Sequence, residues 1–384
     1  MIYLDAAATT KPNKKVVDAM LPYLYEKWYN PSSLYEGAIN VKKDIELARE
    51  IVGNFIGASS DEIYFTSSGS ESNCWAIQGF VNYWLAKGVV PSIVTTKIEH
   101  KSIMSCVDNL YNVDLHYIDV DKNGFINLEQ LDKVLRCNGA LGLHKVILVS
   151  VQFSNNEIGT IQHIKRIAEL THKYHSVFHT DAVQSFGKIP INVDELGIDM
   201  LSASGHKIGA PKGVGILYKN KDVNINPIIY GSQMDNMRGG TENAAYIVGM
   251  AEAVKLCNVE HDVIMEMCKK RDYFISLLEF EFGCKLNGDA KFRLPNNINV
   301  TFPQNITGEA MLYTLDLSEI KVATGSACNS RSIEPSHVLK TIGLGNEDAI
   351  KTVRFTLPDD ITYNDINHVV DEIGKCIKLL SIGG

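Results

Sequence analysis

The chain has 384 residues, 45% of them hydrophobic and 21% charged, which is typical of an ordinary folded protein with room for one large domain and a smaller one. The net charge of −8 argues against nucleic acid as a main partner. No apolar run reaches membrane-spanning length and no basic leader opens the chain, so we expect a cytoplasmic protein without membrane contact.

The segment before the first long helix contains the sequences L-D-A-A-A-T-T and N-P-S-S. The Asn-Pro pair predicts a turn, and Asn30 has two interpretations, as a cap for the helix that follows or as a functional residue. Apolar residues then recur at approximately helical spacing over residues 35–56, which predicts a helix there.

A short strand at residues 63–65 precedes T-S-S-G-S-E-S-N and a helix that extends to residue 86. A strand, a loop of small residues and a helix start together form an anion site, because free backbone N–H groups and the helix dipole point at one spot. Serine and asparagine also cap helices for structural reasons alone. If the chain holds a phosphate, we expect Gly69 and Ser70 to lie at the centre of its cradle.

Two apolar strands, at residues 92–95 and 146–151, each end in polar residues. His100 stands just past the first, and Asn155 and Asn156 follow the second. A lone histidine is more often structural, but a strand tip is where open α/β sheets place their ligands, which favours a role for His100. The asparagines either make turns or bring an amide near a cofactor.

The central stretch has two buried parallel strands near residues 177–178 and 200–201, each followed by polar side chains. Asp181 and Gln184 follow one, and Ser204, His206 and Lys207 follow the other. An ordinary ion pair between Asp181 and Lys207 is the plainer interpretation. The glycine-rich turn after Lys207 and the carboxylate together favour a Schiff-base lysine and an acid partner for the ring nitrogen of pyridoxal phosphate: the residues are Asp181, Gln184, Ser204, His206 and Lys207.

Beyond Lys207 we expect a strand at 214–218, an exposed loop ending in R-G-G-T-E-N, helices at 244–257 and 263–282, and then a shorter α+β pattern.

The eight cysteines include no Cys-x-x-Cys pair, so neither a zinc site nor a disulfide framework is expected, and most should be small buried hydrophobes. Cys328 differs because it lies in A-T-G-S-A-C-N-S-R, where Arg331 could favour the thiolate. An incidental exposed cysteine is the alternative. Arg354, on a strand, either pairs with a carboxylate of the protein or clamps a substrate carboxylate.

Taken together, these segments resemble the cysteine desulfurases, in the NifS/IscS-like branch of the class V aminotransferases, over nearly the whole chain. The resemblance implies the fold type I of pyridoxal phosphate enzymes: a large domain (15–258) with a mainly parallel seven-stranded sheet flanked by helices, and a small α+β domain (1–14 and 259–384) with a mobile cysteine loop (about 322–334). The matching motifs are L-D-A-A-A-T-T, N-P-S-S, T-S-S-G-S-E-S-N, E-H-K-S, N-N-E-I-G, H-T-D-A-V-Q, S-G-H-K, R-G-G-T-E-N, G-S-A-C and V-R-F-T-L.

The resemblance also implies roles for individual residues. Lys207 holds pyridoxal phosphate, His100 stacks on its ring, and Cys328 carries the persulfide formed from L-cysteine. A neighbouring subunit adds Thr241 to the phosphate site, which implies a homodimer with a shared active site. The remaining implied contacts are Asp181 to the ring nitrogen, Gln184 to the phenolic oxygen, Asn155 near the ring, Gly69, Ser70, Ser204 and His206 to the phosphate, and Asn30 and Arg354 to the substrate carboxylate.

Three departures from the family pattern have different consequences. The phosphate loop has Gly-Ser where relatives often have Ala-Thr, which preserves a hydroxyl. The loop before Thr241 reads Q-M-D-N-M-R and lacks one arginine that relatives commonly carry there, which affects the details of that entrance. The chain ends without the longer tail that housekeeping members use toward a scaffold, which leaves the sulfur acceptor open. A scaffold or sulfur-carrier protein is expected as partner, for iron–sulfur clusters or another pathway, and transient iron ligation by Cys328 is undecided. The rival functions are a selenocysteine lyase or another lyase or aminotransferase of the family, a non-catalytic interaction protein, and, least supported, a metal-binding module.

Overall fold

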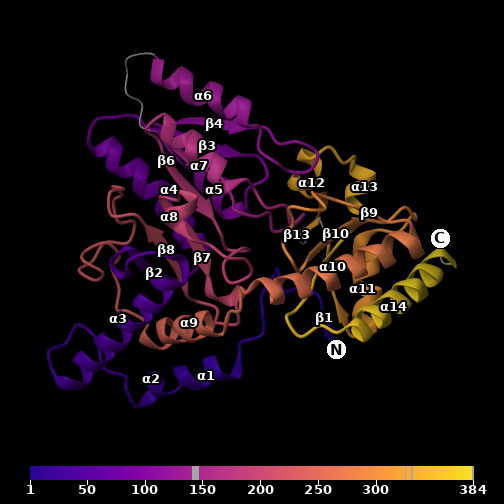
Figure 1. The fold of residues 1–384 in the computed structure, drawn as a ribbon, viewed down its shortest axis with the longest axis horizontal. Coiled ribbons are helices and arrows are strands. Elements are labelled where there is room, and N and C mark those ends of the chain that lie inside the picture. Colours follow the sequence, from indigo (N-terminus) through magenta and orange to yellow (C-terminus); the bar gives the residue numbers. More distant parts are fainter. Residues whose placement is uncertain (141–146, 325, 330–331, 383–384) are drawn as a thin grey trace.

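A computed structural model describes residues 1–140, 147–324, 326–329 and 332–382, with backbone alone at 138–140, 326–329, 332–334 and 382. Figure 1 shows a larger body built on one sheet and a smaller body that carries both termini. In the described part of the chain, no helix is both long and apolar enough to cross a membrane. The helices are α1 (Lys14–Met20), α2 (Pro22–Tyr25), α3 (Glu36–Ile56), α4 (Gly69–Ala86), α5 (Lys101–Asp108), α6 (Leu128–Ala140), α7 (Ile164–Lys173), α8 (Val193–Leu196), α9 (Ala244–Leu256), α10 (His261–Phe282), α11 (Gly308–Leu317), α12 (His337–Thr341), α13 (Asn346–Ile350) and α14 (Tyr363–Ile382), with short 3₁₀ helices η1 (Ser60–Glu62) and η2 (Gly205–Lys207).

The larger sheet has seven strands in the order β2-β8-β7-β6-β5-β3-β4. The run from β7 to β4 is parallel, and β8 is antiparallel to both of its neighbours. The prediction of an α/β fold with a mainly parallel seven-stranded sheet is therefore confirmed. Its strands are β2 (Ile63–Thr66), β3 (Ser92–Thr96), β4 (Asp114–Ile118), β5 (Ile147–Ser150), β6 (Val177–Asp181), β7 (Met200–Ser204) and β8 (Gly215–Lys219).

Helices cover both faces of this sheet because successive strand residues point to opposite sides. Met200 of β7 packs into the cluster under α4 and α5, whereas the next residue, Leu201, packs into the cluster under α3, α7 and α9. This double burial explains why the strands are apolar without alternation, as the sequence indicated. With both faces covered, the carboxyl ends of the parallel strands are where polar side chains can gather.

The smaller body has an antiparallel sheet in the order β12-β15-β10-β9, packed against α10, α11 and α14 around its own apolar cluster. The N-terminal strand belongs here, since β1 pairs in parallel with β11 and Leu4 is buried in the same cluster. The predicted domain boundary near residue 258 stays a prediction. The strands are β1 (Ile2–Tyr3), β9 (Lys285–Leu286), β10 (Asn297–Thr301), β11 (Ile320–Lys321), β12 (Ala323–Thr324), β13 (Ser326–Asn329), β14 (Ser332–Pro335) and β15 (Thr352–Thr356).

Candidate active site

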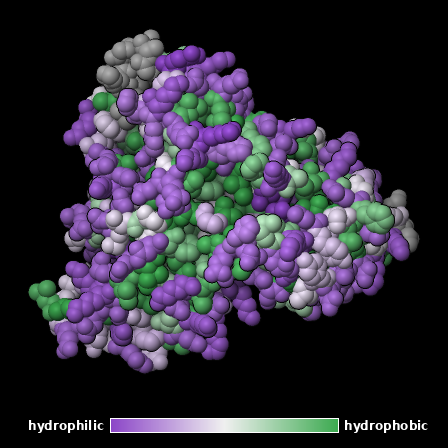
Figure 2. Space-filling view, viewed as in Figure 1, coloured by the Kyte–Doolittle hydropathy of each residue, from purple (hydrophilic) through white to green (hydrophobic). Residues whose placement is uncertain are grey.

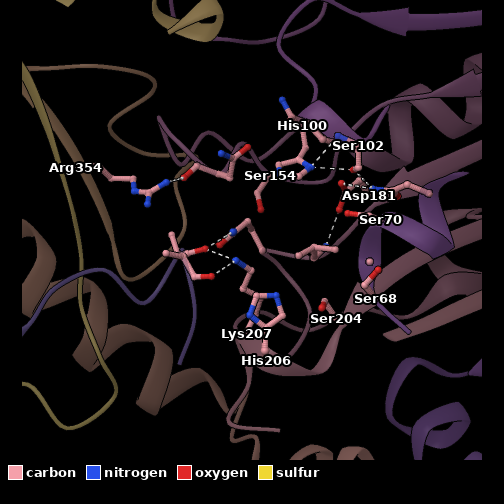
Figure 3. Close-up of a pocket in the computed structure, with 18 residues that line it drawn as sticks. Ser68, Ser70, His100, Ser102, Ser154, Asp181, Ser204, His206, Lys207 and Arg354 are labelled. Atoms are coloured by element: carbon pink, nitrogen blue, oxygen red, sulfur yellow. Dashed lines mark hydrogen bonds between the residues drawn. The ribbon is translucent and has the colours of Figure 1, made fainter. Parts of the chain in front are cut away.

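A cavity of about 380 Å³ lies where the ends of β6 and β7 meet the start of α4 (Figure 3). The fold brings together side chains that lie far apart in the sequence, as parallel strand ends and a helix N-terminus predict. Nine of the predicted site residues line this cavity: Gly69, Ser70, His100, Asp181, Gln184, Ser204, His206, Lys207 and Arg354.

The Lys207 amine lies at the end of η2, directly after β7, and points into the cavity. Its Nζ donates hydrogen bonds to the backbone carbonyls of Ala7 and Ala8, the latter at 2.7 Å. Burial, reinforced by the positive charge of Arg354, lowers the pKa of Lys207 to about 8. A lysine in this state has a substantial neutral fraction near neutral pH, which is what attack on a carbonyl requires.

The Asp181 carboxylate at the end of β6 is buried and held from two sides. Its Oδ2 accepts a hydrogen bond from Asn73 Nδ2 at 2.7 Å, and its Oδ1 accepts one from the Val183 amide at 2.9 Å. Asn73 in turn donates to Ser102 Oγ at 2.9 Å, and its own Oδ1 has no hydrogen-bond partner among the described residues. A fixed buried carboxylate of this kind is suited to hold a protonated ring nitrogen.

The start of α4 forms an anion cradle. Ser68 caps the helix by accepting the Glu71 amide at 3.2 Å, so the amides of Gly69 and Ser70 lie at the positive end of the helix dipole. A side chain on Gly69 would place its Cβ 2.6 Å from Val183 Cγ2, so glycine is what keeps this approach open. An anion cradle, a buried carboxylate and an amine around one cavity are the kinds of group that pyridoxal phosphate requires.

His206 and His100 both line the cavity, but their imidazole rings are held by different contacts. Burial, reinforced by the charge of Lys207, lowers the pKa of His206 to about 4, so its imidazole is neutral at pH 7. His206 Nδ1 lies 3.1 Å from the Thr9 hydroxyl. His100 is the N-cap of α5, and its Nδ1 accepts the Ser102 amide at 3.1 Å, which fixes the orientation of the ring at the cavity.

Arg354 of β15 is already engaged. Its guanidinium donates to Asp5 Oδ1 at 2.7 Å and to the Asn156 carbonyl at 2.9 Å. Its buried Nε has no hydrogen-bond partner among the residues that the structure describes. A ligand carboxylate must therefore share the guanidinium with Asp5 or displace it.

Asn155 does not line the cavity, whereas its neighbour Asn156 does. The Asn155 amide donates to the Ile98 carbonyl at 3.0 Å, and its oxygen accepts the Glu157 and Ile158 amides at 2.8 and 2.9 Å. These bonds stabilise the turn after β5. The structure thus favours the turn interpretation for Asn155, and contact with a cofactor ring stays a prediction.

Asn30 and Thr241 also lie outside the cavity, and both are exposed. Asn30 accepts a backbone hydrogen bond two residues on at 2.9 Å, but the N-cap of α3 is Tyr35, so the interpretation of Asn30 as the helix cap is wrong. Thr241 follows Arg238, whose Nε donates to Glu71 of α4 at 2.9 Å.

Cys328 belongs to β13, which pairs antiparallel with β14, so this segment is a hairpin where an open loop was expected. The Cys328 side chain and Arg331 lie outside the described residues. The predicted mobility of the segment remains a prediction. At the base of the hairpin, His337 Nε2 donates to the Glu99 carbonyl at 3.0 Å, which brings the start of α12 beside His100.

The N-terminal segment and α4 contribute residues that sequence reasoning did not single out. Ala7 accepts hydrogen bonds from both Lys207 and Gln184, the latter at 3.0 Å, and so lies across the cavity. Asn73 is one turn into α4. The signals for them were weak: the L-D-A-A-A-T-T motif has no chemistry of its own, and a polar residue inside an otherwise apolar helix face is the usual mark of a buried hydrogen-bonding position.

We expect Schiff-base formation by the cofactor-free chain to have a midpoint near pH 8. The pKa of Lys207 is lowered to about 8, so the reactive neutral amine accumulates above that pH rather than near 10.5. The same shift means that folding stability rises as pH increases between these two values, because the unfolded chain binds the proton longer. The measurement is the rate of absorbance change on adding pyridoxal phosphate, with borohydride reduction and peptide mapping to assign the lysine.

A second variant, Arg354→Gln, tests the cause of the shift, because it removes a nearby positive charge and leaves Asp5 without its arginine partner. Both changes favour the ammonium form, so the midpoint should move to higher pH. A midpoint that stays near pH 10 in the unmodified chain would contradict the depressed pKa.

The sequence matches the family described as aminotransferase class-V over residues 2–369. It is 44% identical over 384 residues to a cysteine desulfurase IscS of Dictyoglomus turgidum, covering 99% of this chain and 95% of that protein. A solved NifS-like protein has a TM-score of 0.88 at 32% identity, covering 99% of each chain. A structure titled SspA in complex with cysteine has a TM-score of 0.81 at 33% identity, covering 94% of this chain and 99% of that one.

Proposed function

Because this chain belongs to the class-V aminotransferase family, we propose that it is a pyridoxal phosphate-dependent cysteine desulfurase, which converts L-cysteine to L-alanine and holds the sulfur as a persulfide on Cys328. The observation that carries the proposal is the single cavity in which the Lys207 amine, the buried Asp181 carboxylate and the helix-start cradle converge. A selenocysteine lyase is not favoured, since one relative is named a cysteine desulfurase and a similar solved structure is titled as a complex with cysteine.

Bound pyridoxal phosphate supplies a ring that stabilises negative charge at the α-carbon of an amino acid. Asp181, which Asn73 and the Val183 amide hold in place, would keep a proton on the ring nitrogen. Lys207 would hold the cofactor, and its amine in the neutral form would take the Cα proton of the substrate. The lowered pKa of Lys207 suits both the binding of the cofactor and the proton transfer. It leaves part of the amine neutral for attack on a carbonyl, and a base whose pKa is near the operating pH can both accept and return a proton.

Arg354 orients the substrate by binding its carboxylate, in competition with Asp5. A bidentate guanidinium–carboxylate pair fixes direction as well as position. Asn30 is exposed and does not line the cavity. Its position therefore does not support a contact between Asn30 and a substrate bound in the cavity of the same chain.

The sulfur step needs one thiol of the protein. The Cys328 thiolate attacks the substrate sulfur, so an S–S bond forms while the Cβ–S bond breaks, and Cβ receives a proton to give alanine. No external oxidant is consumed, because the electron pair of the broken bond stays with the carbon. The persulfide then passes to a thiol of a scaffold or carrier protein, for iron–sulfur clusters or another sulfur acceptor. A thiolate chemistry of this kind needs a reducing compartment such as the cytoplasm.

Incubation of the purified protein with L-cysteine tests the proposal. We expect a yellow protein whose colour is bleached by borohydride, stoichiometric alanine, and one added sulfur atom on the Cys328 peptide by mass spectrometry. A colourless protein that yields no alanine after addition of pyridoxal phosphate would contradict it. Preference for L-selenocysteine with no sulfur on Cys328 would instead indicate the lyase.

A homodimer with a shared site is part of the proposal. Large apolar side chains gather without cover at the end formed by α1, α2 and the start of α3, including Leu34 at 91% and Trp28 at 67% exposure. Figure 2 shows apolar side chains protruding at this end, at the lower left. Burying them against a second copy would remove a large apolar surface from water. The exposed Thr241 would then reach the phosphate cradle of the partner subunit.

Mixed dimers provide the test of the shared site. We expect chains with Lys207→Ala and chains with Thr241→Asp to be inactive as homodimers, since each lacks a group at both sites. Random reassembly in equal amounts should restore about a quarter of the unmodified activity, because half the dimers are mixed and each has one complete site. Activity no higher than that of the two parent homodimers would show that Thr241 serves its own chain.

A further inference from the structure

A second cavity, of about 490 Å³, opens between α4 and α5 and shares Ser70, His100 and Ser102 with the first. Two thiols line it, Cys74 of α4 and Cys106 of α5. The two helices are held together at this point by the hydrogen bond from Asn73 to Ser102, at 2.9 Å. Cys74 directly follows Asn73, and Cys106 lies one turn after Ser102, so the two thiols fall on the facing sides of the two helices.

Both thiols open onto this cavity. Cys74 Sγ donates a hydrogen bond to the Ser102 carbonyl at 3.9 Å, so it lies against the first turn of α5, the helix that carries Cys106. Cys74 is half-buried and Cys106 is 9% exposed, so the pair sits at the wall of the cavity and reagents can approach Cys74 from it. We propose that Cys74 and Cys106 form a reversible dithiol–disulfide site beside the cofactor cavity, with a peroxide as the oxidant.

The chemistry of the pair supports this assignment. The interaction with the Cys106 thiol lowers the pKa of Cys74 to about 7, and the same interaction followed by burial raises the pKa of Cys106. Among the other described cysteines, burial raises the pKa of Cys257 to about 11 and that of Cys284 to about 12.

The described cysteines also test the prediction that most cysteines are buried. Only three of the seven described cysteines are buried, so that prediction is wrong.

The reaction balances without another reactant. The Cys74 thiolate attacks one peroxide oxygen, the O–O bond breaks, and a sulfenic acid and hydroxide form. The Cys106 sulfur then displaces the second hydroxide, so an S–S bond replaces two S–H bonds and hydrogen peroxide leaves as two waters. The two sulfurs are oxidised by two electrons in total, and a thiol reductant reverses the step.

The disulfide would join α4 to α5 next to the hydrogen bonds that orient the active site. Asn73 holds Asp181, and Ser102 holds His100. A disulfide between Cys74 and Cys106 would therefore lie next to the hydrogen bonds that hold Asp181 and His100, the two groups proposed to contact the cofactor ring. This inference stands on the thiols alone and does not depend on the proposed desulfurase activity.

Oxidation of the purified, cofactor-loaded protein with hydrogen peroxide tests the proposal, followed by alkylation and peptide mapping. We expect a cross-linked peptide joining Cys74 to Cys106 that disappears on treatment with dithiothreitol. If Cys74 and Cys106 remain alkylated as separate thiols at doses that oxidise the exposed Cys137, the proposal is overturned.

A reactivity measurement gives a second test that does not require oxidation. At pH 7 we expect iodoacetamide to modify Cys74 about tenfold more slowly in Cys106→Ala than in the unmodified chain, because a lone thiol of ordinary pKa is only a few per cent thiolate at that pH. The matched control, Cys257→Ala, removes a thiol that does not line this cavity and should leave the Cys74 rate unchanged. Equal rates in Cys106→Ala and the unmodified chain would show that the two thiols do not interact.

Discussion

Replacement of Lys207 by alanine is expected to abolish the yellow colour and to lower the rate of alanine formation by about 10⁴-fold, the scale of losing a general base. The reason is that the same amine binds the cofactor and moves the Cα proton, and no other lysine lines the cavity among the residues that the structure describes. The measurements are the absorbance spectrum and alanine production with saturating pyridoxal phosphate.

Two variants control the Lys207 experiment. Lys207→Arg keeps a cation in the same place but has no amine for a Schiff base, so it should be as inactive as the alanine variant. Lys212→Ala removes an exposed lysine from the same turn and should retain colour and activity. If Lys207→Ala kept more than about a tenth of its activity, another base would have to be sought, because the expected loss is far larger.

Replacement of Cys328 by alanine is expected to end persulfide formation and to lower sulfur release from L-cysteine by at least about a hundredfold, since the attacking nucleophile is missing. The yellow colour and its change on adding L-cysteine should persist, because Lys207, Asp181 and Arg354 remain. This separation of binding from sulfur transfer distinguishes a transfer thiol from a residue needed for folding. The measurements are sulfide and alanine release with a thiol reductant, alongside the spectrum.

Cys137→Ala is the matched control for Cys328, because Cys137 is exposed on α6 and does not line the cavity. It should behave as the unmodified chain in every assay. Unchanged turnover of L-cysteine in Cys328→Ala would contradict the persulfide step while leaving the cofactor chemistry intact. Retained turnover of L-selenocysteine alone would point to a lyase.

The strand tips show what local sequence could establish. Asp181 is the last residue of one short strand, and Lys207 lies at the end of the turn of helix that follows another. Parallel strands must deliver their carboxyl ends to one edge of the sheet. The small residues before α4 likewise identify a helix start with free amides. Local pattern and the rule for where parallel sheets bind ligands are enough to predict that these residues line one cavity, as the structure shows.

The N-terminal segment and Arg354 show what pattern could not reach. Nothing local indicates that the Ala7 carbonyl accepts a hydrogen bond from Lys207, 200 positions away, or that Asp5 pairs with Arg354. The Asn155 side chain faces its own turn while the next residue lines the cavity, a difference of one position that depends on how β5 ends against its neighbours.

The sequence by itself determined the class of sheet, the positions of Lys207 and Asp181 near strand ends, and the family of the chain, because each depends on short runs whose geometry is nearly independent of the rest. Tertiary structure alone decided the lowered pKa of Lys207, the engagement of Arg354 and the arrival of Cys74 and Cys106 at one cavity. Burial, charge and contact between distant segments are properties of packing, and no single segment of the sequence contains them.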